Sequence, residues 1–356
     1  MIKKIFLYPE SAGALALNGA LFAAAAIGLT ALGNPASTGL CASCFLVNVA
    51  GALHLHAKAS QSYLRPELLG IVLGAFFAAC SSREFRVRGR SSPALHFAGG
   101  AFLLLGCEVF IGCPIKTMLR TAGGGGAGLV GLSGLAAGVA FAAAYLKDGF
   151  GFRPKTEIAE SAGLVLPATA FLLLLAASMG AYLFASEGSG GGAIHAPFAV
   201  SAVAGLFFGA AGQRSRFCVT GSIRNAVMLR DFREGAGIVA FLAAALMLNL
   251  LLGNFLPTVA LEPGAHTDLL WAFLATAMVG FGAILISGCP FRQLVLAASG
   301  DMDASAAVAG MLLGAALSVV LGIGSSPAGV TAAGKIAVLA GWIFFLAMGV
   351  RRRKAE

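Results

Sequence analysis

The sequence contains very little charge for its length. Only 11% of its 356 residues are Asp, Glu, Lys or Arg, whereas 58% are hydrophobic. The mean hydropathy is +0.89. So few charged side chains do not cover the surface of a water-soluble domain. This scarcity excludes a soluble globular protein and indicates a polytopic, all-α integral membrane protein.

Several signals of other protein classes are missing as well. No Gly-x-x-x-x-Gly-Lys-Ser/Thr motif is present, so ATP coupling within this chain is not expected. Seven cysteines, an odd number scattered through apolar runs, do not form the framework of a secreted disulfide-rich domain. The net charge of +9 comes from short basic clusters without interleaved aromatic residues, which argues against a nucleic-acid partner.

Long apolar runs recur along the chain. A membrane span needs about 17 to 25 residues to cross roughly 30 Å of hydrocarbon. We expect about ten spans, near residues 12–33, 67–82, 94–112, 127–146, 161–184, 197–211, 235–253, 268–288, 304–323 and 331–350. Four further segments are too short to span: 40–53, 114–122, 216–229 and 290–299. Because irregular backbone at membrane depth must be surrounded by protein or line a cavity, we interpret these four as re-entrant half-helices.

Lysine and arginine are distributed unevenly between the loops. With the N-terminus inside, the clusters at 83–90, 147–155, 230–233 and 351–354 are all cytoplasmic. The outer loops near 185–196, 254–267 and 324–330 contain neither Lys nor Arg. This asymmetry follows the positive-inside rule and predicts a cell-membrane protein with both termini in the cytoplasm. Lys58 and Arg65 are the exceptions.

An internal repeat relates the two halves of the chain. Cys113 and Cys289 are 176 residues apart, and Cys41 and Cys218 are 177 apart. We assign a first repeat with a cytoplasmic start (1–156), a connecting span and external loop (157–196), a second repeat (197–330), and a last span with a basic tail (331–356). Five crossings separate equivalent points, so the second repeat is expected to be inverted, as in many secondary transporters.

A Gly-Cys-Pro motif followed by a cation occurs in both repeats. The two copies are Gly112-Cys113-Pro114 with Lys116, and Gly288-Cys289-Pro290 with Arg292. Proline is tolerated at the first helical position, so each copy predicts a helix that begins at Pro114 or Pro290 with the cysteine as N-cap. The positive end of the helix and the cation would together attract an anion. The alternative for the cations is snorkelling to the interface.

Four cysteines lie at symmetry-related breaks: Cys41, Cys113, Cys218 and Cys289. We interpret them as a stepped line of thiols, the alternative being that cysteine is a small residue that packs well. Cys41 and Cys44 form a C-x-x-C pair, in which Cys44 is either a resolving thiol or a packing residue. The equivalent of Cys44 is Gly221, and no second C-x-x-C completes a metal site, so neither a metal nor a cofactor is predicted.

Other polar residues flank these breaks. Arg214 and Arg216 precede Cys218 and would make the inner vestibule positive. The equivalent residues Asn48 and Asn225 are candidates for a polar pair between the half-helices. Glu108 lies within an apolar run, and we expect it to form a salt bridge, with Lys116 as the candidate partner; the alternative is a role in proton coupling.

Three motifs together resemble one family. They are the two Gly-Cys-Pro copies with their cations, Asn34-Pro35 leading into Cys41-Ala42-Ser43-Cys44, and Gln213-Arg214-Ser215-Arg216-Phe217-Cys218. The chain resembles the YeeE/YedE family of sulfur-compound membrane transporters over nearly its whole length, most closely the YedE-related selenium metabolism branch. Members often carry Arg-Asp after the first and third breaks. This chain has Val47-Asn48 and Arg224-Asn225 instead, so both carboxylates are missing.

The resemblance implies an importer of a small selenium or sulfur species, such as a thiosulfate-like anion, that is passed along cysteines. It also implies a cytoplasmic sulfurtransferase-like (TusA/SirA-like) acceptor protein. The chain is not expected to be an enzyme. Two alternatives stay open: a membrane thiol oxidoreductase or chalcogen-transfer protein using Cys41 and Cys44, and a structural membrane subunit.

Overall fold

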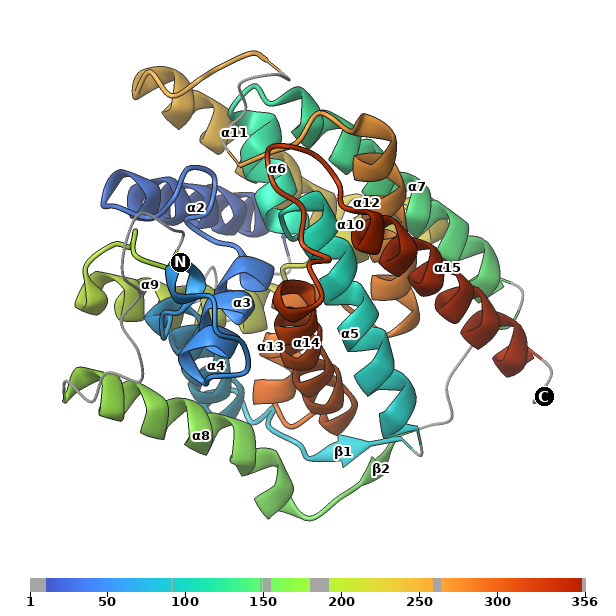
Figure 1. Ribbon diagram of the computed structural model, residues 1–356. Helices are drawn as coiled ribbons and strands as arrows, with labels where there is room; N and C mark the ends of the chain where they lie inside the picture. Colours follow the sequence, from blue (N-terminus) through green and yellow to red (C-terminus); the bar gives the residue numbers. More distant parts are fainter. Residues whose placement is uncertain are drawn as a thin grey trace.

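The computed structural model describes residues 11–90, 92–147, 149, 155–179, 192–258 and 264–353, and these are almost entirely helical (Figure 1). The long helices are α2 (Ala12–Ala31), α4 (Pro66–Ser81), α5 (Pro93–Phe110), α7 (Gly126–Lys147), α8 (Glu160–Ser178), α9 (Phe198–Ser215), α11 (Arg233–Leu251), α12 (Leu269–Leu285), α14 (Met302–Val320) and α15 (Ala332–Arg353). The short ones are α3 (Ala42–Ala52), η1 (Ala59–Gln61), α6 (Pro114–Ala122), α10 (Val219–Leu229) and α13 (Pro290–Ala298).

The membrane class is confirmed by the helices. Among the described residues, nine helical segments are long and apolar enough to cross a membrane, so the chain is an all-α multi-pass membrane protein. The expected span at 197–211 forms a helix, α9, but is not one of the nine, because its last turn carries Gln213 and Arg214. The N-terminal residues 1–10, the end of the expected span 161–184 and the tail at 354–356 lie outside the described residues.

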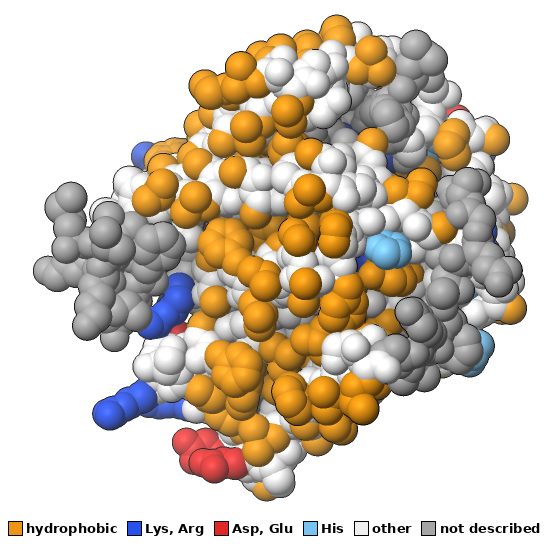
Figure 2. All heavy atoms as spheres, turned by 90° about the vertical axis from the view of Figure 1, so that its left-hand side faces the viewer, with side chains coloured by type: hydrophobic (Ala, Val, Ile, Leu, Met, Phe, Trp, Pro, Cys, Tyr) orange, Lys and Arg blue, Asp and Glu red, His pale blue; other side chains and the backbone are white. Residues whose placement is uncertain are grey.

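Apolar side chains cover the side of the molecule shown in Figure 2, with Lys and Arg gathered toward its lower left edge. One of the helices on this side is α8, whose side chains are mostly exposed. Apart from Glu160 in its first turn, its large exposed residues are apolar: Leu164, Val165, Phe171, Leu172 and Leu175. A helix that turns such residues outward is suited to contact with lipid rather than water.

The four short segments are confirmed as helices that begin at cysteine. Cys41, Cys113, Cys218 and Cys289 are the N-caps of α3, α6, α10 and α13. As the motif predicts, α6 and α13 have proline at the first helical position, preceded by an extended cysteine. Each short helix has 9 to 11 residues, too few to cross about 30 Å of hydrocarbon.

The largest helix contacts come in equivalent pairs. Helix α2 packs on α11, and α9 packs on α4; likewise α5 packs on α14, and α12 packs on α7. Under the repeat, α2 corresponds to α9, α4 to α11, α5 to α12 and α7 to α14. Each main interface is therefore built twice, each time from one helix of each half, and the halves interlock. The two inverted repeats and their boundaries stay a prediction.

Glycine allows these helices to touch. Gly134 and Gly138 of α7 correspond to Gly310 and Gly314 of α14. A Cβ added to Gly138 would overlap the backbone carbonyl of Ala277, and one added to Gly310 would overlap that of Phe97. These contacts are the small-residue packing typical of membrane helices. They hold α12 and α5, the helices that lead into α13 and α6.

Replacing Gly310 by valine should therefore destabilise the protein by at least about 2 kcal/mol, because the side chain can be accommodated only if α14 moves away from α5. Thermal unfolding of the purified protein in detergent measures the loss. Gly28→Val is the matched control, since a Cβ at Gly28 meets nothing within 4 Å. Equal stability of the two variants would contradict the close packing.

A small sheet, which the sequence analysis did not anticipate, holds one edge of the bundle. Strand β1 (Arg88–Gly89) pairs antiparallel with β2 (Thr156–Glu157). On its other side, the backbone N–H groups of Arg86 and Arg88 donate to the carbonyl groups of Ser299 and Gly300, at 3.3 and 3.1 Å. These bonds tie the segment after α4 to the turn between α13 and α14.

Candidate functional site

The four N-capping cysteines meet in two pairs. The Cys41 and Cys113 thiols are neighbours, so the N-termini of α3 and α6 meet. The Cys218 and Cys289 Sγ atoms are 4.0 Å apart, which joins the N-termini of α10 and α13. Each pair of thiols therefore joins the two half-helices of one repeat: α3 with α6 in the first repeat, and α10 with α13 in the second. Two positive helix ends point at each pair, an arrangement that favours an anion.

The first thiol cluster consists of Cys41, Cys44, Cys113 and Lys116. Cys44 Sγ is 3.0 Å from Cys41 Sγ, and Lys116 Nζ is 3.6 Å from Cys44 Sγ. Cys41 and Cys113 are fully buried, Lys116 is 5% exposed and Cys44 is half-buried. Lys116 does not snorkel: a Cβ on Gly112 would lie 3.0 Å from its Cδ, so the side chain folds back over the helix break.

Glu108 does not form the salt bridge expected with Lys116. No ion pair joins the two residues, both of which the structure describes, and Glu108 Oε1 is buried without a hydrogen-bond partner. The physical reason is the folding back of Lys116, which directs its ammonium group to Cys44 instead. One carboxylate oxygen of Glu108 is therefore left without a partner beside the first thiol cluster.

The second thiol cluster consists of Cys218 and Cys289. Cys218 Sγ accepts a hydrogen bond from the backbone N–H of Gly221 (3.3 Å) and is 3.3 Å from Thr220 Oγ1. As in the first repeat, a Cβ on Gly288 would lie 3.0 Å from the following cation, Arg292. The glycine of each Gly-Cys-Pro motif thus leaves room for a cation to pass over the break.

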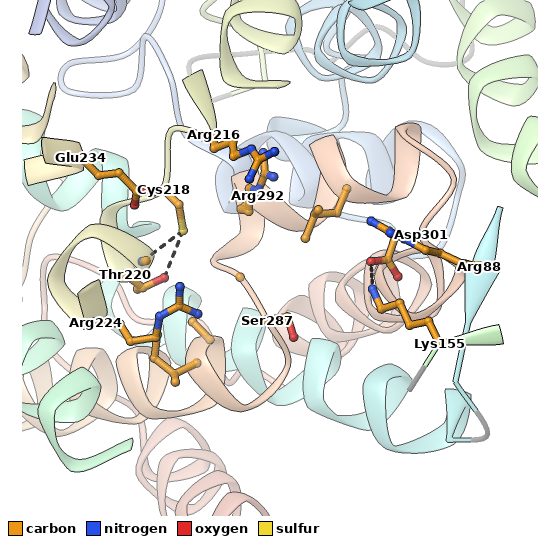
Figure 3. Close-up of a pocket in the computed structure, with 15 residues that line it drawn as sticks. Arg88, Lys155, Arg216, Cys218, Thr220, Arg224, Glu234, Ser287, Arg292 and Asp301 are labelled. Carbon is orange, nitrogen blue, oxygen red and sulfur yellow. Dashed lines mark hydrogen bonds and ion pairs between the residues drawn. The ribbon is translucent and has the colours of Figure 1, made fainter. Parts of the chain in front are cut away.

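A basic cavity of about 290 Å³ opens beside Cys218 (Figure 3); we call it the thiol cavity. Its charged lining residues are Arg88, Lys155, Arg216, Arg224, Arg292, Glu234 and Asp301. Asp301 is paired with Lys155, and Glu234 accepts a hydrogen bond from Asn225 (3.0 Å). Five cations against two engaged carboxylates leave the cavity positive, as an anion requires.

The arginines expected near Cys218 separate in the structure. Arg216 and Arg292 line the thiol cavity, and Arg292 Nη1 also donates to the Gly212 carbonyl (3.2 Å). Arg214 instead lines a different hollow, mostly apolar, together with Phe77 and Phe207. Arg214 lies in the last turn of α9, whereas Arg216 is its left-handed C-cap, where the chain leaves the helix, so the two side chains point to different sides.

Asn48 and Asn225 bond within their own halves rather than to each other. Asn48 donates to the Gln61 carbonyl (2.7 Å) and accepts from Arg65 Nε (2.8 Å). Asn225 donates to Glu234 and accepts from the neighbouring Arg224 (2.8 Å). Arg65 caps the start of α4 and Glu234 lies in the first turn of α11. Asn48 thus attaches α3 to α4, and Asn225 attaches α10 to α11. In each case the next long helix offers a nearer polar partner than the other asparagine.

Arg65, an exception to the expected charge asymmetry, has a structural role. It is 1% exposed, with Glu67 at 3.8 Å and the rings of Phe45 and Tyr63 within 5.4 Å. It also donates to Asn34 Oδ1 at 3.2 Å. The position of a cation held in this way is determined by its buried partners and not by the positive-inside rule.

Two polar residues that the sequence analysis missed donate hydrogen bonds to backbone carbonyls at the helix breaks. A helix end leaves backbone carbonyls without partners. Arg120 Nη1 donates to the Phe110 carbonyl (3.0 Å), and Gln293 Nε2 donates to the equivalent Ile286 carbonyl (2.7 Å). The available signal was that both are polar residues within short, mostly buried helices.

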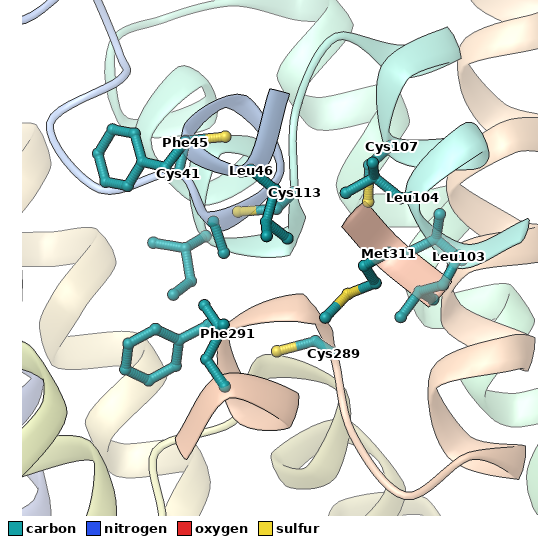
Figure 4. Close-up of a cluster of buried hydrophobic side chains, with 14 of the residues drawn as sticks. Cys41, Phe45, Leu46, Leu103, Leu104, Cys107, Cys113, Cys289, Phe291 and Met311 are labelled. Carbon is teal, nitrogen blue, oxygen red and sulfur yellow. The ribbon is translucent and has the colours of Figure 1, made fainter. Parts of the chain in front are cut away.

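Apolar side chains surround the thiols (Figure 4). Cys41, Cys113, Cys218 and Cys289 are each at most 7% exposed and belong to one continuous apolar core. Phe45, Leu46, Phe291 and Met311 belong to the same core. Helix α3 contacts α13, and α6 contacts α10, so the two thiol clusters lie on adjoining elements. The four thiols are therefore buried, and among them Cys218 also lines the thiol cavity.

One comparison with known proteins gave a match. Residues 214–326 match the model of a family described as sulphur transport. A search of curated proteins found no significant match. The matched segment covers about a third of the chain and includes Cys218, Cys289 and Arg292. In combination with the nine apolar helices, the match indicates a membrane transporter of a sulfur species.

Proposed function

We propose that this protein moves a small sulfur- or selenium-containing anion across the membrane along its four N-capping cysteines. The observation that carries the proposal is the pairing of thiols at opposed helix N-termini, with a basic cavity directly against Cys218. The chain acts as a transporter, not as an enzyme, and delivers the substrate to the cytoplasm.

The first cluster receives the substrate. Lys116 and the N-termini of α3 and α6 attract the negative charge, while the thiols of Cys41 and Cys113 contact the chalcogen. A thiol is suited to this step because it is a weak, polarizable hydrogen-bond donor that holds a soft anion without trapping it. The charge therefore draws the ion in, and the sulfur atoms select it.

The second cluster releases the substrate. From Cys113 the chalcogen passes to Cys289 and Cys218, and then into the thiol cavity, where Arg216, Arg224 and Arg292 compensate its charge. An uncompensated anion in the dry core would cost many kcal/mol, so movement requires a substrate small enough to stay in contact with successive donors. A sulfurtransferase-like protein at the cytoplasmic mouth is the proposed acceptor.

A second candidate function uses Cys41 and Cys44 as a redox pair. The 3.0 Å separation of their sulfur atoms and the ammonium group 3.6 Å from Cys44 favour it. In that reaction the Cys41 thiolate attacks the outer sulfur of a compound such as thiosulfate, which breaks the S–S bond, releases sulfite and leaves a persulfide on Cys41. The Cys44 thiolate then attacks the Cys41 sulfur, expels sulfide and forms a Cys41–Cys44 disulfide, which a thiol reductant from solution must reduce again. Such a protein exchanges or reduces the chalcogen without transporting it.

Uptake into proteoliposomes separates the two functions. We expect labelled thiosulfate, selenite or selenide to accumulate inside vesicles containing the protein, and Arg292→Met to slow this uptake at least about tenfold, because it removes a charge-assisted contact. A mixed disulfide or selenosulfide trapped on Cys41, with no net flux of label, would favour the redox pair. No uptake of any of the three compounds, and no trapped adduct, would refute both.

A further inference from the structure

A second basic hollow lies next to the thiol cavity, where the C-terminal ends of α4 and α9 meet α13. Its volume is about 310 Å³. We call it the arginine hollow; it is lined by Arg83, Glu84, Arg86, Arg88, Gln213, Arg216, Arg292, Leu296 and Ser299. Five of these nine residues are arginines, a density that lipid anchoring does not require.

The backbone directs two of these arginines, Arg86 and Arg88, toward the hollow. The segment 86–88 is extended and bonded to the α13–α14 turn through the Ser299 and Gly300 carbonyls. In an extended chain alternate side chains point the same way. Val87, between them, is 5% exposed and its carbonyl accepts a bond from Ile158, so Arg86 and Arg88 are turned to the open side. The site is thus built on a fixed element.

The charge of the hollow is not neutralised by the protein. In the described part of the chain, no carboxylate forms an ion pair with any of its five guanidinium groups. Its one acid, Glu84, accepts a hydrogen bond from Gln213 Nε2 at 3.0 Å. Like charges held together in a concave site raise the local potential and attract a counter-ion. The guanidinium group matches phosphate and sulfate oxygens bidentately.

We propose that the arginine hollow binds a multivalent oxyanion of the phosphate or sulfate type, carried by a small molecule. The volume fits such a group, and Ser299 and Gln213 supply neutral hydrogen-bonding partners at its wall. Arg216 and Arg292 line both this hollow and the thiol cavity, where their side chains lie next to each other (Figure 3). Arg88 lines both as well, so a ligand in the hollow competes with the transported ion for three shared cations.

Equilibrium binding of labelled pyrophosphate to the purified full chain tests the site. The chain is placed in nanodiscs of neutral phosphatidylcholine, so no flux is involved. Arg83→Gln with Arg86→Gln should weaken binding at least about tenfold, because two charge-assisted contacts are lost. Arg230→Gln with Arg233→Gln removes the same charge from exposed positions that line neither cavity, and it should change binding less than about twofold.

Three outcomes would overturn the proposal: no binding by the wild type, equal weakening in both double variants, or tighter binding of an acidic peptide such as polyglutamate at the same arginines. A second set of nanodiscs, which contain phosphatidylglycerol, distinguishes lipid phosphate from a free ligand as the source of the anion. Weaker pyrophosphate binding there assigns the hollow to lipid phosphates, and unchanged binding assigns it to a free ligand. Cys218→Ala should leave pyrophosphate binding intact even where it stops uptake, so the two proposals fail separately.

Discussion

Cys289→Ala and Cys113→Ala are each expected to reduce uptake of the chalcogen substrate by at least about a hundredfold, equivalent to ~2.7 kcal/mol in the barrier. Each thiol occupies a helix N-terminus and meets one other thiol, Cys289 with Cys218 and Cys113 with Cys41. Removing one takes away a thiol contact at that step and leaves its partner thiol beside an apolar gap. Uptake in a cell that lacks other routes, and in proteoliposomes, measures the loss.

The control for these variants is Cys107→Ala. Cys107 is equally buried, at 0% exposure, but it lies in the last turn of α5 and caps no helix. It should retain uptake, and all three variants should remain folded by size-exclusion chromatography and thermal unfolding. Full uptake by both Cys113→Ala and Cys289→Ala would leave the line of thiols without a function. Cys289→Ser tests the sulfur itself, because a hydroxyl donates a hydrogen bond but is not a soft contact.

Arg65→Ala is expected to give a large loss of stability, about 3–5 kcal/mol, because it leaves the fully buried Glu67 carboxylate without its cation. Glu67 Oε1 then keeps only the hydrogen bonds from Asn34 (2.9 Å) and Ser201 (3.0 Å). The same change releases Asn48, and with it the attachment of α3 to α4. Unfolding in detergent, followed by temperature or denaturant, measures the effect.

The double variant Arg65→Met with Glu67→Gln should recover part of the lost stability, since it removes both charges together and retains much of the side-chain volume. Arg83→Gln is the control for the loss of an arginine at an exposed position, and it should change stability by less than about 0.5 kcal/mol. If Arg65→Ala unfolds no more easily than Arg83→Gln, the buried network around Arg65 does not hold α3 in place.

The positions of the half-helices could be predicted from local chemistry. A proline after cysteine ends one apolar run and begins another, whatever surrounds it, so α6 and α13 begin at the expected residues. The partners of the polar side chains could not be predicted in the same way. Asn48 and Asn225 share a register but bond to Arg65 and Glu234, because the nearest polar group depends on how α4 and α11 pack.

The cations near Cys218 were likewise predictable only in part. The arginines before Cys218 predicted a positive vestibule, yet two further cations reach it from a small sheet that no pattern indicated: Arg88 lies in β1, and Lys155 directly precedes β2. Arg214 carries the same charge and lies only two residues from Arg216, but it faces another hollow. Side-chain direction at a helix end depends on where the chain leaves the helix, which the sequence does not report.

The amino-acid sequence alone determined that this is an all-α membrane protein with short helices beginning at four cysteines, because apolar length and proline act over a few neighbouring residues. The tertiary structure alone decided which thiols meet, which cations face them and which asparagine holds which helix. Those outcomes depend on residues far apart in the chain, brought together where glycines let α5 contact α14 and α7 contact α12.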